Sequence, residues 1–188
     1  MQTKASKATP TSGPDAIAML TADHKAVKAL FKEFEGLADN ENANEQKLDL
    51  VQKICDELTV HAEVEEEIFY PAVRAAIDDE DLLDEAEVEH ATLKDLIGQL
   101  EGMNADDDLY NAKVTVLSEY VEHHVKEEEG EMFPKAREAD LDTAALGAEM
   151  ASRKSELKSE LGMLDDEADE PPQPKAGNGS KRAGKQMR

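Results

Sequence analysis

Two segments of the chain repeat the same pattern of residues that can bind metals. HAEVEEEIFYPAVR begins at His61 and HVKEEEGEMFPKAR begins at His124, and in each a glutamate follows four residues later, at Glu65 and Glu128. Residues i and i+4 lie on one face of a helix, so each pair presents an imidazole nitrogen and a carboxylate oxygen to one point. Two such helices facing each other would suit iron, manganese or zinc, and two bridging carboxylates would suit a pair of metals.

Each copy of the pattern also carries a proline and an arginine at matching positions. The prolines are Pro71 and Pro134, and the arginines are Arg74 and Arg137. We expect the prolines to bend or end the two helices at the same depth below the site. We expect the arginines to pair with acidic side chains near that end. For both residue types a structural role is favoured over a chemical one.

Four of the five histidines fall on apolar stripes with the periodicity of a helix. The stripe positions are Ile17, Leu20, His24, Val27, Phe31, Phe34 and Ala38; Leu48, Val51, Ile54 or Cys55, Leu58, His61, Glu65 and Ile68; Leu83, Ala86, His90, Leu93, Ile97 and Leu100; and Tyr110, Val114, Leu117, Val121, His124 and Glu128. Such stripes are typical of a helix bundle. Turn-like gaps near residues 38–44, 78–81 and 102–108 predict antiparallel neighbours.

The buried polar residues on these stripes predict a metal site. Charged groups in a bundle core are costly unless they are paired or bound to a cation. A single histidine on an apolar stripe is more often a satisfied core residue, and a single His-x-x-x-Glu is more often a surface pair. Four such histidines with two matched pairs are hard to place by chance. The predicted metal ligands are His24, His61, Glu65, His90, His124 and Glu128.

The neighbouring polar residues are assigned to the surroundings of this site. His123 competes with His124, but only His124 continues the apolar stripe and repeats the ten-residue distance to the proline. We therefore place His123 at the rim, with a supporting role. The remaining glutamates near the two pairs are expected to form a solvated acidic collar: Glu63, Glu66, Glu67, Glu127 and Glu129.

These patterns predict an all-α, up-down antiparallel four-helix bundle over residues 15–138. An additional C-terminal helix is expected over residues 142–164, with Leu146, Met150, Leu157, Leu161 and Leu164 on its apolar side. Residues 1–14 are predicted to be a flexible lead-in and residues 165–188 a disordered tail. No phosphate-binding loop, dinucleotide fingerprint, Gly-x-Ser-x-Gly or Cys-x-x-Cys is present in the sequence.

The composition narrows the function classes further. The formal net charge of −23 argues against a nucleic-acid surface on the bundle, although the basic C-terminal end could touch one. The single cysteine, Cys55, excludes an intramolecular disulfide and any Cys-based metal motif, and its apolar neighbours favour a buried thiol. No apolar run approaches the length of a membrane span. We therefore expect a cytoplasmic protein, and a monomer because the apolar stripes are used inside one bundle.

The order of a single histidine, a His-x-x-x-Glu pair, a single histidine and a second such pair resembles the hemerythrin-like (HHE cation-binding) domains. The resemblance covers about residues 15–138 and agrees with a four-helix bundle. It implies that the four histidines are iron ligands and that Glu65 and Glu128 bridge two irons, as an oxo- or hydroxo-bridged pair. It also implies that oxygen or a related small molecule binds at an open position.

The match to the oxygen-carrying hemerythrins is incomplete at one position. Those proteins use a fifth histidine one turn from the third-helix ligand, where this chain has Ala86 and Lys94. One metal would be short of a ligand, and water, Glu87, Tyr120 or His123 could take that place. A site with fewer nitrogens is expected to suit reaction with oxygen, peroxide or nitric oxide, or the holding of iron, better than reversible oxygen carriage.

The leading interpretation is therefore a non-haem diiron protein that binds or reacts with oxygen, peroxide or nitric oxide, with enzymatic turnover left open. The alternative is an iron or divalent-metal binding or storage protein without redox turnover, which metal stoichiometry would distinguish. A ferritin-like ligand set would need two Glu-x-x-His pairs, and the chain has one, Glu87 with His90. An interaction protein that uses the bundle only to carry its tails would leave the buried ligand set unexplained.

Overall fold

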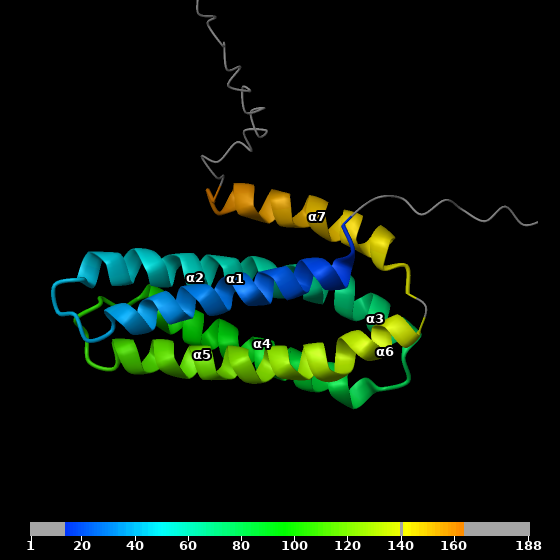
Figure 1. Ribbon diagram of the computed structural model, residues 1–188, viewed down its shortest axis with the longest axis horizontal. Coiled ribbons are helices and arrows are strands. Elements are labelled where there is room, and N and C mark those ends of the chain that lie inside the picture. Colours follow the sequence, from blue (N-terminus) through cyan, green and yellow to red (C-terminus); the bar gives the residue numbers. More distant parts are fainter. Residues whose placement is uncertain (1–13, 140, 164–188) are drawn as a thin grey trace, which may run out of the picture.

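In the computed structural model, four long antiparallel helices form a bundle, and a fifth helix lies across two of them (Figure 1). The structure describes residues 14–139 and 141–163. The long helices are α1 (Ala16–Leu37), α2 (Asn44–Val64), α4 (Glu80–Glu101) and α5 (Tyr110–Glu127). The remaining elements are the π-helical segments η1 (Glu65–Phe69) and η2 (Glu128–Met132), and the helices α3 (Tyr70–Ala76), α6 (Phe133–Glu138) and α7 (Thr143–Glu160). The predicted fold class is confirmed.

The repeated prolines lie just beyond a local widening of the helix. Pro71 has no N–H to donate, and its ring crowds the carbonyl four residues earlier. The chain forms a π turn before it, in which the Tyr70 N–H bonds to the Glu65 carbonyl five residues back. The second copy repeats this arrangement with Phe133 and Pro134. Of the two predicted effects of the prolines, to bend or to end the helices, the second is wrong, because η1 continues into α3 and η2 continues into α6.

The bundle core is divided into two apolar clusters with the predicted site between them. The loop-side cluster, near the α1–α2 and α4–α5 connections, includes Phe31, Phe34, Ile54, Leu58, Ile97 and Leu117. The π-side cluster, around η1 and η2, includes Ile17, Leu20, Phe69, Leu83, Met132 and Phe133. Cys55 belongs to the loop-side cluster, as predicted, and burial raises its thiol pKa to about 12.

The predicted stripes are buried with a few exceptions. Leu48, near the start of α2, is 37% exposed. Ile68 is half-buried and Phe69 takes its core position, because the π turn inserts a residue into the helical repeat. Leu161 is exposed just beyond the end of α7, and Leu164 lies outside the described residues.

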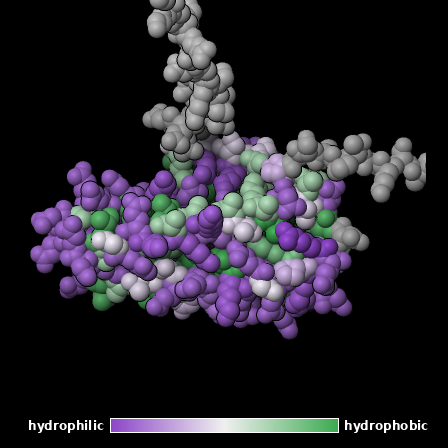
Figure 2. Space-filling view, viewed as in Figure 1, coloured by the Kyte–Doolittle hydropathy of each residue, from purple (hydrophilic) through white to green (hydrophobic). Residues whose placement is uncertain are grey.

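Helix α7 packs against α1, α2 and η1, and Figure 1 shows it crossing above α1 and α2. Its apolar contacts come from Met150 and Leu157, both of which are buried. Gly147 allows a close approach, since a Cβ there would lie 1.8 Å from the Pro14 carbonyl oxygen. The face in Figure 2 is mostly hydrophilic. Among the described helices, none combines the length and apolar character needed to cross a membrane.

Candidate metal centre

The six predicted ligands lie together in the middle of the bundle. Each of the long helices α1, α2, α4 and α5 contributes one histidine, and each π segment begins with one of the two glutamates. All six side chains are buried, with at most 8% of any residue exposed. The helical stripes therefore bring together residues that are up to 104 positions apart in the chain, from His24 to Glu128.

The histidine rings face each other in two pairs. His24 Nε2 lies 3.2 Å from His61 Nε2, and His90 Nε2 lies 3.1 Å from His124 Nε2. The first pair joins α1 and α2, and the second joins α4 and α5. Four inward-facing imidazole nitrogens are thus available at the centre of an otherwise apolar core.

Each glutamate reaches both histidine pairs. Glu65 Oε2 lies 3.1 Å from His61 Nε2 and 3.5 Å from His90 Nε2. Glu128 Oε2 makes the complementary contacts, at 3.1 and 3.5 Å, with one nitrogen of each pair. Each glutamate therefore lies between the two histidine pairs. The structure shows two buried groups of potential metal ligands that have Glu65 in common.

The outer ring nitrogens of three histidines are held by a second layer of carboxylates. These contacts are His24 Nδ1 to Glu129 at 2.9 Å, His90 Nδ1 to Glu66 at 3.0 Å and His124 Nδ1 to Glu89 at 2.7 Å. Ionised carboxylates only accept hydrogen bonds, so the Nδ1 atoms donate and the Nε2 lone pairs point inward. In the His90–His124 pair two such lone pairs lie 3.1 Å apart, and they repel unless a proton or a metal ion lies between them. Both ring pairs belong to buried groups of side chains that could hold a metal ion.

Glu66 and Glu129 correct the predicted solvated collar, because both hydrogen-bond a site histidine. Glu89, which the sequence did not single out, has the same role. A surface glutamate and one that supports a histidine look alike in a chain with 44 acidic residues. Only the packing of neighbouring helices identifies which carboxylate meets which ring.

The carboxylates at the centre are incompletely paired. Glu65 Oε1 is buried without a hydrogen-bond partner, and Glu128 Oε2 has only site histidines beside it, with His24 Nε2 at 3.1 Å. Such buried groups are costly in a protein interior. His24 and His124 lower the Glu128 pKa to about 2, against the opposing effect of burial, so this carboxyl stays ionised. Buried, ionised and incompletely paired oxygens are a second sign that a cation belongs at this position.

Tyr70 is a member of the site that the sequence did not reveal. Its hydroxyl lies 3.0 Å from Glu128 Oε1, 3.2 Å from His90 Nε2 and 3.5 Å from His124 Nε2, and the residue is 2% exposed. Five residues of regular α-helix would turn Tyr70 about 140° away from Glu65. The π turn of η1 returns it to the same face. The sequence could have indicated Tyr70 as a site residue only if the π turn before Pro71 had been recognised.

The residues considered as replacements for the fifth histidine lie at the surface. Tyr120 is 44% exposed, and the His123 side chain is 56% exposed beside Glu127, as its predicted rim position requires. Glu87 faces outward and pairs with Arg74 at 2.8 Å, which confirms acidic pairing for the first of the repeated arginines. Lys94, one turn after His90, instead holds Glu66 at 2.7 Å.

Nearly all of the predicted bundle matches a known protein family. Residues 15–136 match the family model described as the hemerythrin HHE cation-binding domain. The chain belongs to the hemerythrin HHE cation-binding domain family. The buried histidines and glutamates of this hemerythrin-like bundle form groups that can hold metal ions.

Two individual proteins are similar to this hemerythrin-like chain. A protein of Nostoc sp. named DNA nickase is 29% identical over 149 residues, which cover 77% of this chain but 40% of the relative. This chain therefore spans less than half of the relative's length. A crystal structure of a hemerythrin HHE cation-binding domain-containing protein from Mycobacterium kansasii superposes with a TM-score of 0.67. It is 24% identical and covers 80% of this chain and 91% of its own, which supports the shared fold.

The two halves of the hemerythrin-like site differ at one matched position. Tyr70 and Phe133 each stand nine residues after the histidine of their copy. The Phe133 ring stacks on His24, with centroids 5.8 Å apart, whereas the Tyr70 ring lies 5.3 Å from His90. The pair formed by His90 and His124 therefore has a phenol oxygen beside it, and the pair formed by His24 and His61 has a hydrocarbon ring.

A small cavity of about 20 Å³ lies between the histidine rings and the loop-side cluster. Its lining includes all four site histidines but neither Glu65, Glu128 nor Tyr70. Its apolar walls are formed by Val27, Leu58, Leu93, Ile97, Val121 and Val125. This volume has room for one water-sized molecule. The inward nitrogens thus have carboxylates on one side and a small apolar space on the other.

Metal binding is expected to release protons and to strengthen as the pH rises. Burial lowers the His61 pKa, but the Glu65 and Asp23 carboxylates outweigh this effect and raise the pKa to about 10. The metal-free ring is therefore protonated at neutral pH, and a metal ion must displace that proton. Each displaced proton makes the apparent affinity rise about tenfold per pH unit below pH ~10.

The raised His61 pKa also makes the metal-free fold less stable as the pH rises, whereas metal binding becomes stronger. The stabilisation from protonated His61 is fully present below about pH 6.5 and is lost as the pH rises through about 10.

Calorimetric titration with zinc in buffers of different ionisation enthalpy, at several pH values, would count the released protons. Zinc binding at neutral pH without proton release would contradict this prediction.

Proposed function

We propose that this chain binds two iron ions at the hemerythrin-like site and that the pair binds or reacts with oxygen, peroxide or nitric oxide. The observation that carries this proposal is the pair of glutamates, each of which reaches both pairs of facing imidazole nitrogens. His24 and His61 would hold one ion, and His90 and His124 would hold the other. Imidazole with carboxylate is a donor set that suits iron.

Bound iron would supply electrons to, or accept them from, a small oxidant or nitric oxide. The protein contributes the surroundings in which this occurs. The apolar cavity excludes bulk water from the inward nitrogens and limits the ligand to a few atoms. A surface groove of about 450 Å³, lined by Tyr70 and Lys94 among others, lies beside it. Lys94 lines both spaces, so its ion pair with Glu66 stands between the groove and the cavity.

Tyr70 would complete the second metal position, in place of the fifth histidine of the oxygen carriers. Burial and the nearby Glu65 and Glu128 carboxylates raise the Tyr70 pKa well above its ordinary value. The hydroxyl therefore keeps its proton in the metal-free protein and donates a hydrogen bond to Glu128 Oε1 at 3.0 Å. A cation opposes those carboxylates and lowers the pKa of an adjacent phenol again.

The first test is iron per chain, measured with the absorption spectrum under anaerobic conditions and then after air, peroxide or nitric oxide is added. We expect two irons and new near-ultraviolet or visible bands on addition of at least one of these reagents. Reversal of an oxygen-dependent band under vacuum would indicate carriage, and its persistence would indicate reaction. Failure to bind iron, or an unchanged spectrum with every reagent after ferrous reconstitution, would refute the proposal.

Replacing Tyr70 by phenylalanine is expected to weaken metal binding on one side of the site only. The substitution makes the second half resemble the first, where Phe133 stands at the matched position. Affinity at the His90–His124 pair should fall by about tenfold or more, and any visible absorption that depends on a phenol oxygen should disappear. Tyr120→Phe is the control, because Tyr120 lies at the surface. Equal effects of the two substitutions on the spectrum and on metal release would contradict the assignment.

The second candidate is metal binding or storage without redox turnover. It is favoured by the formal charge of −23, which attracts cations over the whole surface. A store would take up many ions per chain, and their uptake would survive changes to the buried histidines. The enclosed site has six predicted ligands, so a limit of two ions that depends on those ligands favours the leading proposal.

The Nostoc relative's name raises DNA as a substrate, but we expect the bundle to offer a poor surface for it. Nucleic-acid binding depends on positive charge that neutralises phosphates, and this chain carries 44 acidic and 21 basic residues. The shared region is also only 40% of that relative. Incubation of the iron-loaded protein with supercoiled plasmid would reveal any nicking directly.

A further inference from the structure

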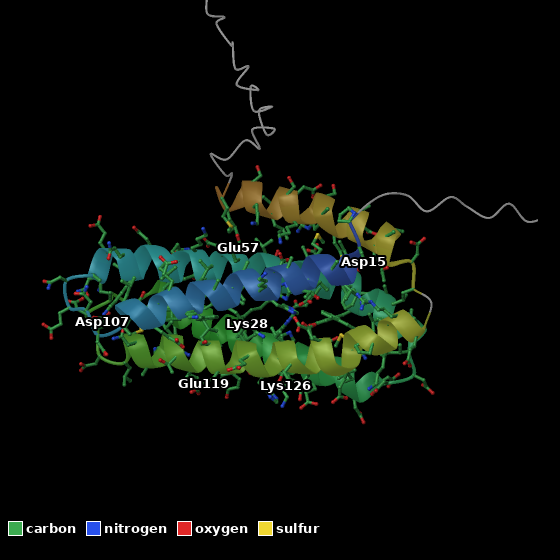
Figure 3. The ribbon with its side chains drawn as sticks, viewed as in Figure 1. Asp15, Lys28, Glu57, Asp107, Glu119 and Lys126 are labelled. Carbon is green, nitrogen blue, oxygen red and sulfur yellow. The ribbon has the colours of Figure 1, made fainter. Side chains whose placement is uncertain are left out.

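Helix α7 lies outside the region that matches the family, which ends at residue 136. Three of its basic residues, which lie within about two helical turns, reach carboxylates on the bundle. Arg153 holds Glu67 with bonds of 2.6 and 3.0 Å, and Lys158 holds Glu57 at 2.7 Å. Figure 3 shows Glu57 on the side of α2 that faces α7. The helix is therefore fixed by ion pairs as well as by its buried apolar residues.

The third of these ion pairs leads directly to the candidate metal centre. Lys154 Nζ donates to Asp23 Oδ1. The other oxygen of that carboxylate lies 3.7 Å from His61 Nδ1. Asp23 is mostly buried, and its carboxyl pKa is held low by His61 and Lys154 against the opposing effect of burial. Asp23 also lines the small cavity beside the histidines. A charged chain of contacts thus runs from α7 through α1 to a predicted ligand on α2.

The same arrangement occurs on the other side of the bundle. Lys94 holds Glu66 at 2.7 and 2.8 Å, and Glu66 accepts a hydrogen bond from His90 Nδ1 at 3.0 Å. In both cases a lysine fixes the carboxylate that faces the outer nitrogen of a site histidine. In the first case the lysine comes from the helix that lies outside the matched region.

His61 depends on this support more than the other three histidines do. Its Nδ1 atom is buried without a hydrogen bond, at 3.7 Å from Asp23, whereas the other three Nδ1 atoms have bonds of 2.7–3.0 Å. Lys154 is the one hydrogen-bond donor described for the Asp23 carboxylate. Without it, that carboxylate would lose its fixed orientation and the ring would lose its remaining outer contact.

We propose that Lys154 is a positioning residue of the metal centre, which holds Asp23 against His61 and so slows loss of the metal ion at the His24–His61 pair. This inference rests on the proposed two-metal function. Carboxylates that orient a metal-bound histidine affect metal affinity by about 10–100-fold in general. Helix α7 would therefore be part of the metal centre in this chain.

The test uses the full chain loaded with zinc, which has no redox chemistry, and measures release of each ion to an excess of a chromophoric chelator. Lys154→Met is expected to release one of the two ions at least about tenfold faster than the unchanged protein. Lys154→Arg keeps the cation and should restore slow release. Arg153→Met is the matched control, because it removes one positive charge from the same helix and one ion pair between that helix and the bundle, at a carboxylate whose described bonds are to Arg153 alone.

A second readout separates positioning from general loosening of α7. In zinc-loaded protein with isotope-labelled histidine, the His61 ring signals should shift in Lys154→Met and stay in place in Arg153→Met. Release from Lys154→Met that is unchanged or slower, or equally faster release from Arg153→Met, would overturn the inference. Two ions bound by the unchanged protein with equal release from all variants would refute this inference alone. No metal bound by the unchanged protein would refute the proposed function itself.

Discussion

Replacing Glu65 by glutamine is expected to remove both metal ions from the purified protein. The Glu65 carboxylate lies within 3.1–3.5 Å of a nitrogen from each histidine pair, so it serves both positions. A neutral amide of the same size cannot balance the charge of two cations in a buried site. We expect affinity to fall by about three orders of magnitude, or roughly 4 kcal/mol. Metal content after dialysis, measured by elemental analysis, should drop from two ions per chain to a small fraction of one.

The control for this substitution is Glu63→Gln, on the same helix, which changes the formal charge equally. Glu63 is half-buried, away from the buried ligand groups. The metal-free Glu65→Gln protein should stay folded, because the change removes a buried charge that has incomplete pairing. Circular dichroism would verify the helix content. Two tightly bound ions in Glu65→Gln would show that the glutamate does not bridge the two positions.

Complete removal of the metal is expected to lower the melting temperature of the unchanged protein by about 8–16 °C. A ligand that binds only the folded state stabilises it by about 4 kcal/mol when its free concentration is a thousand times Kd. For a chain of this size each kcal/mol shifts Tm by about 2–4 °C. The physical cause is the buried set of imidazoles and carboxylates, which loses its compensating cations. Scanning calorimetry with and without chelator would measure the shift.

The Glu65→Gln variant provides the control for this second experiment. Because that variant should hold no metal, its Tm should be the same with and without chelator. A Tm of the unchanged protein that does not respond to complete metal removal would contradict a buried site. A chelator effect of equal size in both proteins would mean that the chelator acts on the fold and not through the metal.

The sequence by itself determined the bundle and the centre of the site. Helical periodicity is a local property, so the stripes through His24, His61, His90 and His124 could be read without any knowledge of packing. The i,i+4 spacing then placed each glutamate beside its histidine. Burial of these residues follows because a stripe with Leu, Ile and Val neighbours must face the core.

The tertiary structure decided everything that depends on contacts between helices or on a departure from the regular helix. Glu66, Glu89 and Glu129 became supports for histidines only when neighbouring helices packed together. Among 44 acidic residues no local pattern separates these three from solvated ones. The link from Lys154 to Asp23 joins positions 131 residues apart, so it depends on where α7 docks.

Tyr70 is the clearest case of a site residue that depends on a departure from the regular helix. Ideal helical geometry turns it away from Glu65, and the alternatives considered from the sequence for the missing ligand were water, Glu87, Tyr120 and His123. The π turn before Pro71 adds a residue to the helical repeat and brings the hydroxyl into the centre. The sequence could determine which residues share a regular face, because that depends on a fixed rotation per residue. Where the backbone leaves that rotation, or a contact crosses between helices, only the folded chain determines the neighbours.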